Sequence, residues 1–196
     1  MSNQNLTYQN IFCLEGEWNS TNLKEKTTVK PLINFMEETF GIEYVFRKVN
    51  SKESFLKYLE NLNYYRKGKF KSYGILYLAF HGESNCIYLD NEDHITLDEI
   101  IEETDGLLTD RIIHFGSCKT LKLDESDLKK FLKKSGAKAV SGFSQYIDFL
   151  DSSLFDIAYL TCLTGYDKTG YIYNHMIKNY GELTNKLGFV YIDKNS

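Results

Sequence analysis

The chain has 196 residues and a formal net charge of −4, and its 42% hydrophobic and 26% charged residues are ordinary for a soluble protein. This charge provides no basic surface for a nucleic-acid backbone, so we expect no nucleic-acid partner. No stretch approaches the roughly 18 apolar residues that cross a bilayer, and the polar N-terminus does not resemble a signal peptide, so we expect no membrane partner. Four scattered cysteines without a CxxC pair are typical of a reducing compartment and predict a cytoplasmic protein.

The first part of the chain alternates short apolar runs with amphipathic segments. Strands are expected over residues 11–14 and 42–49 because both runs are rich in β-branched and aromatic side chains. Between them, apolar residues at helical spacing predict a helix over 30–40, which Gly41 ends as a C-terminal cap. A second helix is expected to begin after Ser51, whose hydroxyl is a favourable N-cap.

The segment 73–80 is almost entirely apolar, which is typical of a parallel strand buried on both faces. The segments 86–89 and 94–97 flank polar residues and predict a β-hairpin, after which Thr96 or Asp98 caps a helix. The remaining predicted elements are a strand over 111–115, a helix over 124–135, a strand over 137–143, helices over 152–163 and 171–180, and a last strand over 189–192.

The order of these elements predicts the fold class. Strands that alternate with helices form a mainly parallel sheet covered by helices on both faces, so we expect an α/β three-layer sandwich with a small β-hairpin added after the strand over 73–80. No repeat or composition shift marks a boundary, and residues 1–196 are predicted to form one domain. In such folds the functional residues lie beyond the carboxyl ends of the strands.

Two reactive side chains occupy that position. His81 directly follows the apolar run 73–80, and Cys118 lies shortly after the strand over 111–115. Cysteine attacks as a thiolate and needs a base or positive charge nearby, which His81 supplies in this prediction. The backbone N–H groups of Gly82 and Cys118 are candidates to stabilise an oxyanion. The predicted site is therefore a cysteine–histidine dyad.

The motifs around these residues resemble the caspase-like cysteine peptidases of clan CD, and most of all their CHAT domains. Leu78-Ala79-Phe80-His81-Gly82 is similar to the histidine block of that family, and Phe115-Gly116-Ser117-Cys118-Lys119-Thr120 is similar to its cysteine block. The resemblance implies a caspase-like fold, with Cys118 as nucleophile, His81 as its imidazole partner and Gly82 as oxyanion donor. It further implies a protein or peptide substrate, acyl-enzyme chemistry, and a bacterial effector that a regulatory protein partner activates.

Three residues after the strand over 137–143 are candidates for substrate binding. Ser144, Asp148 and Asp151 follow this strand and are expected at the same rim as the dyad. A carboxylate there would recognise a basic side chain beside the scissile bond. It would equally serve as a cap for the helix that begins near residue 152, and the sequence leaves both interpretations open.

Other histidines and cysteines are interpreted as structural. His114 lies inside an apolar strand and is expected to be a satisfied core residue, whereas His94 is expected to be exposed in the hairpin. Cys13 and Cys162 fall within predicted elements of the core. Cys86 is close to His81, but the spacing matches no metal site, and no glycine pattern matches a nucleotide-binding loop, so neither metal nor cofactor is predicted.

Two alternatives to a peptidase remain at this point. An inactive caspase-like module would keep the dyad in a blocked cleft and act only through protein contacts. A flavodoxin-like or TIR-like module would bind a small ligand at the same rim of the sheet. Glu15, Glu17 and Trp18, which follow the first strand, either line a cleft there or form a solvated loop.

Overall fold

A six-stranded sheet forms the centre of the molecule, which is described by a computed structural model over residues 8–19, 21–22, 24–66, 68–90, 92–165 and 169–194. Its strands are β1 (Ile11–Glu15), β2 (Tyr44–Lys48), β3 (Ile75–Ala79), β7 (Ile112–Phe115), β8 (Ala139–Phe143) and β9 (Phe189–Asp193). They are ordered β2–β1–β3–β7–β8–β9, and every pair is parallel except β8 with β9. The predicted mainly parallel sheet is confirmed.

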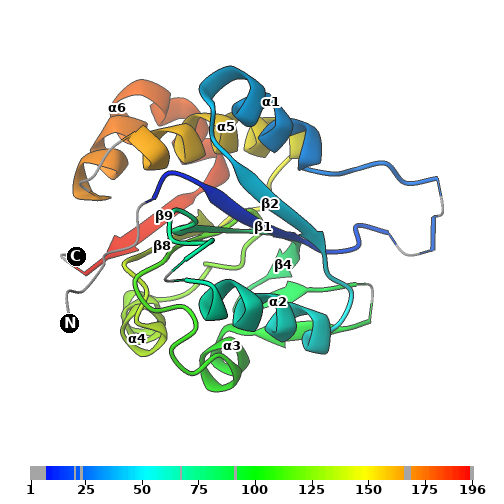
Figure 1. The fold of residues 1–196 in the computed structure, drawn as a ribbon. Helices are drawn as coiled ribbons and strands as arrows, with labels where there is room; N and C mark the ends of the chain where they lie inside the picture. The colour runs from blue at the N-terminus through cyan, green and yellow to red at the C-terminus, as the bar shows by residue number, and fades with distance from the viewer. Residues whose placement is uncertain are drawn as a thin grey trace.

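Helices cover both faces of this sheet (Figure 1). One layer contains α1 (Lys30–Phe40), α5 (Phe149–Gly165) and α6 (Thr169–Leu187), and the other contains α2 (Lys52–Tyr64), α3 (Leu97–Glu103) and α4 (Glu125–Ser135). The three-layer sandwich expected from the order of elements is therefore present. Among the described residues, no helix is both long and apolar enough to cross a membrane.

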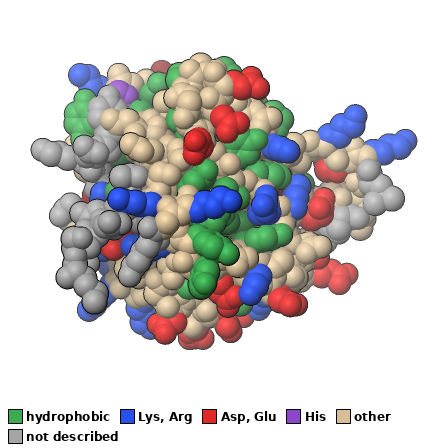
Figure 2. Space-filling view, viewed as in Figure 1, with side chains coloured by type: hydrophobic (Ala, Val, Ile, Leu, Met, Phe, Trp, Pro, Cys, Tyr) green, Lys and Arg blue, Asp and Glu red, His purple; other side chains and the backbone are tan. Residues whose placement is uncertain are grey.

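The inner strands are mostly apolar because each of their faces packs against a layer of helices. In β3, Leu76 and Leu78 belong to the hydrophobic cluster that includes Phe55 of α2, whereas Ile75 and Tyr77 belong to the opposite cluster. At the edge, β2 instead ends in exposed charged residues, and Figure 2 shows Lys and Arg side chains on the face that carries it. Charges on an edge strand oppose pairing with other chains.

Several helix ends follow the local signals in the sequence. Gly41 ends α1 with a φ of 68°, a left-handed conformation in which a side chain would be strained. Ser51 caps α2, and Thr96 rather than Asp98 caps α3. One predicted start was wrong, because α5 already begins at Phe149. The helix predicted over 171–180 forms the first part of α6, which is kinked at Tyr180 with a φ of −132° and then continues to Leu187.

A second, three-stranded antiparallel sheet follows β3. The predicted hairpin is confirmed as β5 (Cys86–Tyr88) and β6 (His94–Thr96). The sequence did not predict its third strand, β4 (His81–Glu83), which pairs with β5. Three residues with a central glycine give no strand pattern, so this strand exists because of its partner and not its own propensity.

Candidate active site

The carboxyl ends of two neighbouring strands carry the predicted dyad. β3 and β7 are adjacent and parallel, with Leu78 opposite Phe115, so the residues that follow them emerge at one rim of the sheet. His81 and Cys118 both line a cavity of about 150 Å³ at this rim. The structure thus brings the two predicted residues to one concave site.

Gly82 allows the histidine strand to lie directly against the cysteine turn. A Cβ at position 82 would be 2.7 Å from the carbonyl oxygen of Cys118 and closer still to the Thr120 hydroxyl. No side chain fits in that space, so glycine is required for the two segments to touch. The glycine after the histidine therefore controls the distance between the two halves of the site.

Thr120 fixes the cysteine turn on the small sheet. The Thr120 hydroxyl donates to the carbonyl oxygen of Cys86 at 3.2 Å and lies 2.7 Å from the hydroxyl of Ser117. Ser117 and Thr120 are buried, and Lys119 between them has a φ of 53° in the left-handed region. The turn is thus held from both sides of Cys118, which limits the positions that its side chain can take.

The ring orientation of His81 is fixed by a backbone group. Nε2 of His81 lies 2.8 Å from the carbonyl oxygen of Trp18, which only accepts hydrogen bonds, so Nε2 carries the proton and donates it. In the neutral ring this leaves Nδ1 without a proton and able to accept one. The Trp18 ring also meets the imidazole edge-on, with the ring centroids 5.0 Å apart.

Glu15, at the end of β1, orders the segment that presents Trp18. One oxygen of this fully buried carboxylate accepts from Trp18 Nε1 at 3.0 Å and from the Val29 amide at 2.6 Å. The other accepts from the Thr28 hydroxyl at 2.8 Å and pairs with Lys48 at 2.9 Å. The segment between β1 and α1 projects from the body in Figure 1, and Glu15 ties both of its ends to the sheet.

We predict that Glu15→Gln destabilises the protein and slows any reaction that needs His81. The amide nitrogen of the glutamine would face hydrogen-bond donors where the carboxylate has an accepting oxygen. We expect this mismatch to cost about 2 kcal/mol of unfolding free energy and to lower Tm by about 4–8 °C. Thermal melting measured beside the rate of Cys118 alkylation tests both effects. Glu17→Gln, two residues away and only half-buried, is the matched control and is expected to change neither. A Glu15→Gln protein that melts like the wild type would contradict the prediction.

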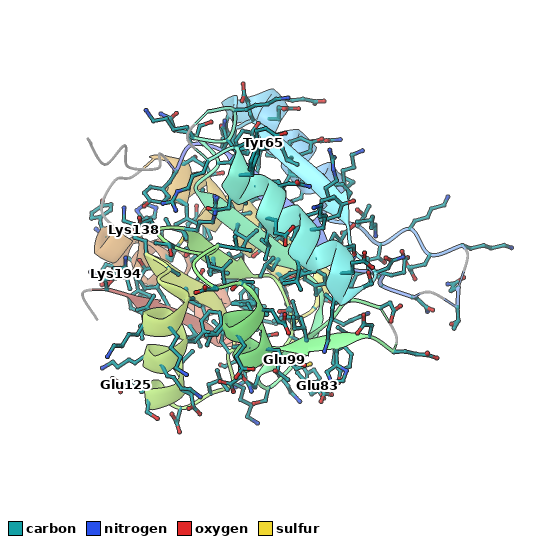
Figure 3. The ribbon with its side chains drawn as sticks, turned by 60° about the horizontal axis from the view of Figure 1, so that its bottom comes forward. Tyr65, Glu83, Glu99, Glu125, Lys138 and Lys194 are labelled. Carbon is teal, nitrogen blue, oxygen red and sulfur yellow. The ribbon has the colours of Figure 1, made fainter. Side chains whose placement is uncertain are left out.

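The other three cysteines are in environments that suppress their reactivity. Burial raises the pKa of the thiols of Cys13, Cys86 and Cys162. At Cys86 the carboxylates of Glu83 and Glu99 raise the pKa further, and Figure 3 shows both on the same side of the molecule. Cys118 is half-buried, with its sulfur 3.8 Å from the Ile147 carbonyl oxygen, and it opens to the cavity.

Limiting iodoacetamide at neutral pH is therefore expected to modify Cys118 first. The thiolate is the reacting species, and each of the other thiols has a raised pKa, so their alkylation should lag at least tenfold. Peptide mapping by mass spectrometry after short exposures measures the order. Earlier modification of Cys86 would move the reactive site into the hairpin and remove the basis for the dyad.

A buried polar network lies beneath the cavity. Asp156 of α5 accepts from the Tyr77 hydroxyl at 2.6 Å and pairs with His114 Nε2 at 2.9 Å. The other ring nitrogen of His114 lies 3.0 Å from the Ser141 hydroxyl, to which Tyr159 donates. Burial and Asp156 raise the pKa of Tyr77 well above its usual value, so this phenol stays protonated and donates. The interpretation of His114 as a satisfied core residue is confirmed.

None of the three predicted substrate-binding residues lines the cavity. Asp148 caps the start of α5 by accepting from the amides of Leu150 and Asp151, and the Asp151 side chain pairs with Lys186 at 2.5 Å. Ser144 donates to the Gly188 carbonyl at 2.9 Å. The capping interpretation of Asp148 is thus observed. Its role in binding substrate remains a prediction, as do those of Asp151 and Ser144.

Sequence reasoning missed two contributors to the site. The Trp18 carbonyl is a backbone group, which no residue pattern reveals. Asp156 had a signal, because it is a lone carboxylate on the apolar face of α5 beside Phe155 and Tyr159. Among the described residues, no group of three or more His, Cys, Asp or Glu side chains is placed to hold a metal.

The sheet order, the covering helices and the site at the strand ends define a protein with a caspase-like fold. The solved structures that resemble it include caspase-1 from Spodoptera frugiperda, with a TM-score of 0.55 and 12% sequence identity over 97% of this chain and 88% of that chain. The chain belongs to a family of unknown function, DUF6642, whose model matches residues 8–192. No curated protein matches the sequence.

Proposed function

We propose that the protein is a cysteine endopeptidase that cleaves protein substrates through Cys118 and His81. The observation that carries the proposal is that both side chains line one cavity at the rim, with the His81 tautomer fixed by the Trp18 carbonyl. The caspase-like fold supports the same assignment, and the resemblance of the histidine and cysteine blocks to CHAT domains supports it further. A protein partner that activates the site belongs to this proposal.

The reaction follows from the positions of the groups. Nδ1 of His81 takes the thiol proton, and the Cys118 sulfur attacks the peptide carbonyl carbon, forming a C–S bond. The oxyanion is stabilised by the N–H groups of Gly82 and Cys118, and collapse of the tetrahedral species breaks the C–N bond. His81 gives its proton to the leaving amine. Water then attacks the thioester, which releases a carboxylic acid and restores the thiol.

Chemical labelling of new amino termini tests the proposal. A denatured protein mixture incubated with the wild type should gain termini that are absent after incubation with the Cys118→Ser protein, with mass spectrometry as the readout. The absence of new termini from a protein whose Cys118 reacts with iodoacetamide would favour the inactive interaction module.

A further inference from the structure

The cavity beside Cys118 has an apolar wall. Val29, Phe80, Ile147 and Phe149 line it together with the Tyr77 and Trp18 rings. Gly116, two residues before the thiol, also lines the cavity and lets the Tyr77 ring pack against the backbone, because a Cβ there would be 2.6 Å from that ring. The cavity therefore continues from the sulfur toward the sheet and the start of α5.

The size of the cavity limits its occupant to one side chain. Its volume is about 150 Å³, and apolar cavities of about this size in proteins hold a group as large as benzene. A leucine, methionine or phenylalanine side chain matches that space. The residue whose carbonyl Cys118 attacks has its Cα next to the sulfur, so its side chain is the one that enters.

The polar groups of the cavity are already engaged. Asp156 is the one carboxylate among the described residues that line it, and Tyr77 and His114 both bind this carboxylate. The hydroxyls of Ser152 and Ser153 both donate to the carbonyl oxygen of Phe149. A cationic side chain would lose its water and gain only a carboxylate that an imidazole and a phenol already satisfy.

The mouth of the cavity has the same character. Phe149 lines it yet is 43% exposed, and Tyr146 and Leu150, which adjoin the lining residues Ile147 and Phe149, are 70% and 65% exposed. Exposed apolar side chains beside a concave site are typical of surfaces that bind apolar ligands. An apolar substrate segment thus finds apolar contacts inside the cavity and on the exposed part of Phe149.

From these observations, and resting on the proposed peptidase function, we propose that the cavity selects an uncharged apolar side chain, of the size of leucine, methionine or phenylalanine, on the amino side of the scissile bond. Asp156 forms the closed end of this pocket as a structural group and does not bind a basic residue. The specificity determinants are then Ser153 and the apolar lining, in place of Asp148 and Asp151.

Peptidyl acyloxymethyl ketones that differ only in the residue before the reactive carbonyl test this specificity. Methionine and lysine form a matched pair of similar length, and leucine and asparagine a pair of similar shape. We expect Cys118 to be labelled at least tenfold faster by the apolar member of each pair. Mass spectrometry of the intact protein gives the rate, and peptide mapping gives the site.

A cavity-filling variant supplies the second measurement. Ser153→Phe places a ring in the pocket and should shift the preference from methionine and leucine toward alanine by at least tenfold. Leu154→Phe adds the same ring at the next position, which is exposed and does not line the cavity, and should keep the preference of the wild type.

The possible outcomes separate the two proposals. Faster labelling by the lysine or arginine reagent would overturn the apolar pocket and support the peptidase. An unchanged preference in Ser153→Phe would also overturn the pocket. If no peptidyl reagent labels Cys118 while iodoacetamide does, both the peptidase function and the pocket that rests on it are overturned.

Discussion

Cys118→Ala is expected to abolish cleavage and to leave the fold intact. The cysteine lies in a half-buried turn whose shape is held by Ser117 and Thr120, so loss of one sulfur atom removes little packing. We expect a cost of about 1 kcal/mol or less in unfolding free energy, and a fall in Tm of at most about 4 °C. The measurements are cleavage of the identified substrate and thermal melting on the same preparation.

His81→Ala should be nearly as damaging, because the two side chains act as one unit. Losses within such a unit do not add, so the double variant should be no less active than either single variant. His94→Ala is the matched control, since His94 is an exposed histidine of the same small sheet and does not line the cavity. A Cys118→Ala protein that still cleaves would end the peptidase assignment.

The second large effect is expected from His114→Ala, and it concerns stability. This change removes the partner of Asp156 and leaves its carboxylate buried with Tyr77 alone. Loss of a partner from a buried carboxylate, together with the cavity that the missing ring leaves, costs about 3–5 kcal/mol, which corresponds here to a fall in Tm of about 6–20 °C. Thermal and urea-induced unfolding measure the effect.

The same network supports the floor of the cavity, so the variant should also lower the rate of labelling by apolar peptidyl reagents. His94→Ala again serves as the control, with an unchanged Tm expected for an exposed ring. If the His114→Ala protein melts within about 2 °C of the wild type, the contact between His114 and Asp156 contributes no net stability. The network would then be interpreted as a feature that favours one packing arrangement of the core over others.

Sequence patterns predicted the fold well where one physical signal dominates. The apolar run around β3 indicated burial on both faces, and together with the alternation of strands and helices it predicted a parallel sheet covered on each side. The start of α5 was misplaced. The first turn of α5 depends on Asp148, which sequence reasoning left open between a cap and a substrate contact.

The sequence predicted the two reactive side chains of the site, but not the contacts that orient them. His81 and Cys118 follow buried strands, and the topology of parallel sheets brings such residues to one rim. The hydrogen bond that fixes the His81 ring comes from a backbone carbonyl, and Glu15 acts on it only through Trp18. Contacts of this kind depend on how the segment between β1 and α1 folds back, which residue spacing does not encode.

The close contact at Gly82 also bears on how such sites are recognised in other chains. His81 belongs to β4 of the small sheet and Cys118 to the turn after β7, and these two segments touch at position 82, where a Cβ would be 2.7 Å from the Cys118 carbonyl oxygen. A chain with alanine at this place would keep the same topology and both reactive groups, yet would hold them apart by roughly the width of a methyl group. A histidine and a cysteine at the expected positions of a sequence are then not enough to show that the two groups lie close together. A glycine where the two segments touch is required as well, and a search for reactive side chains alone does not detect it.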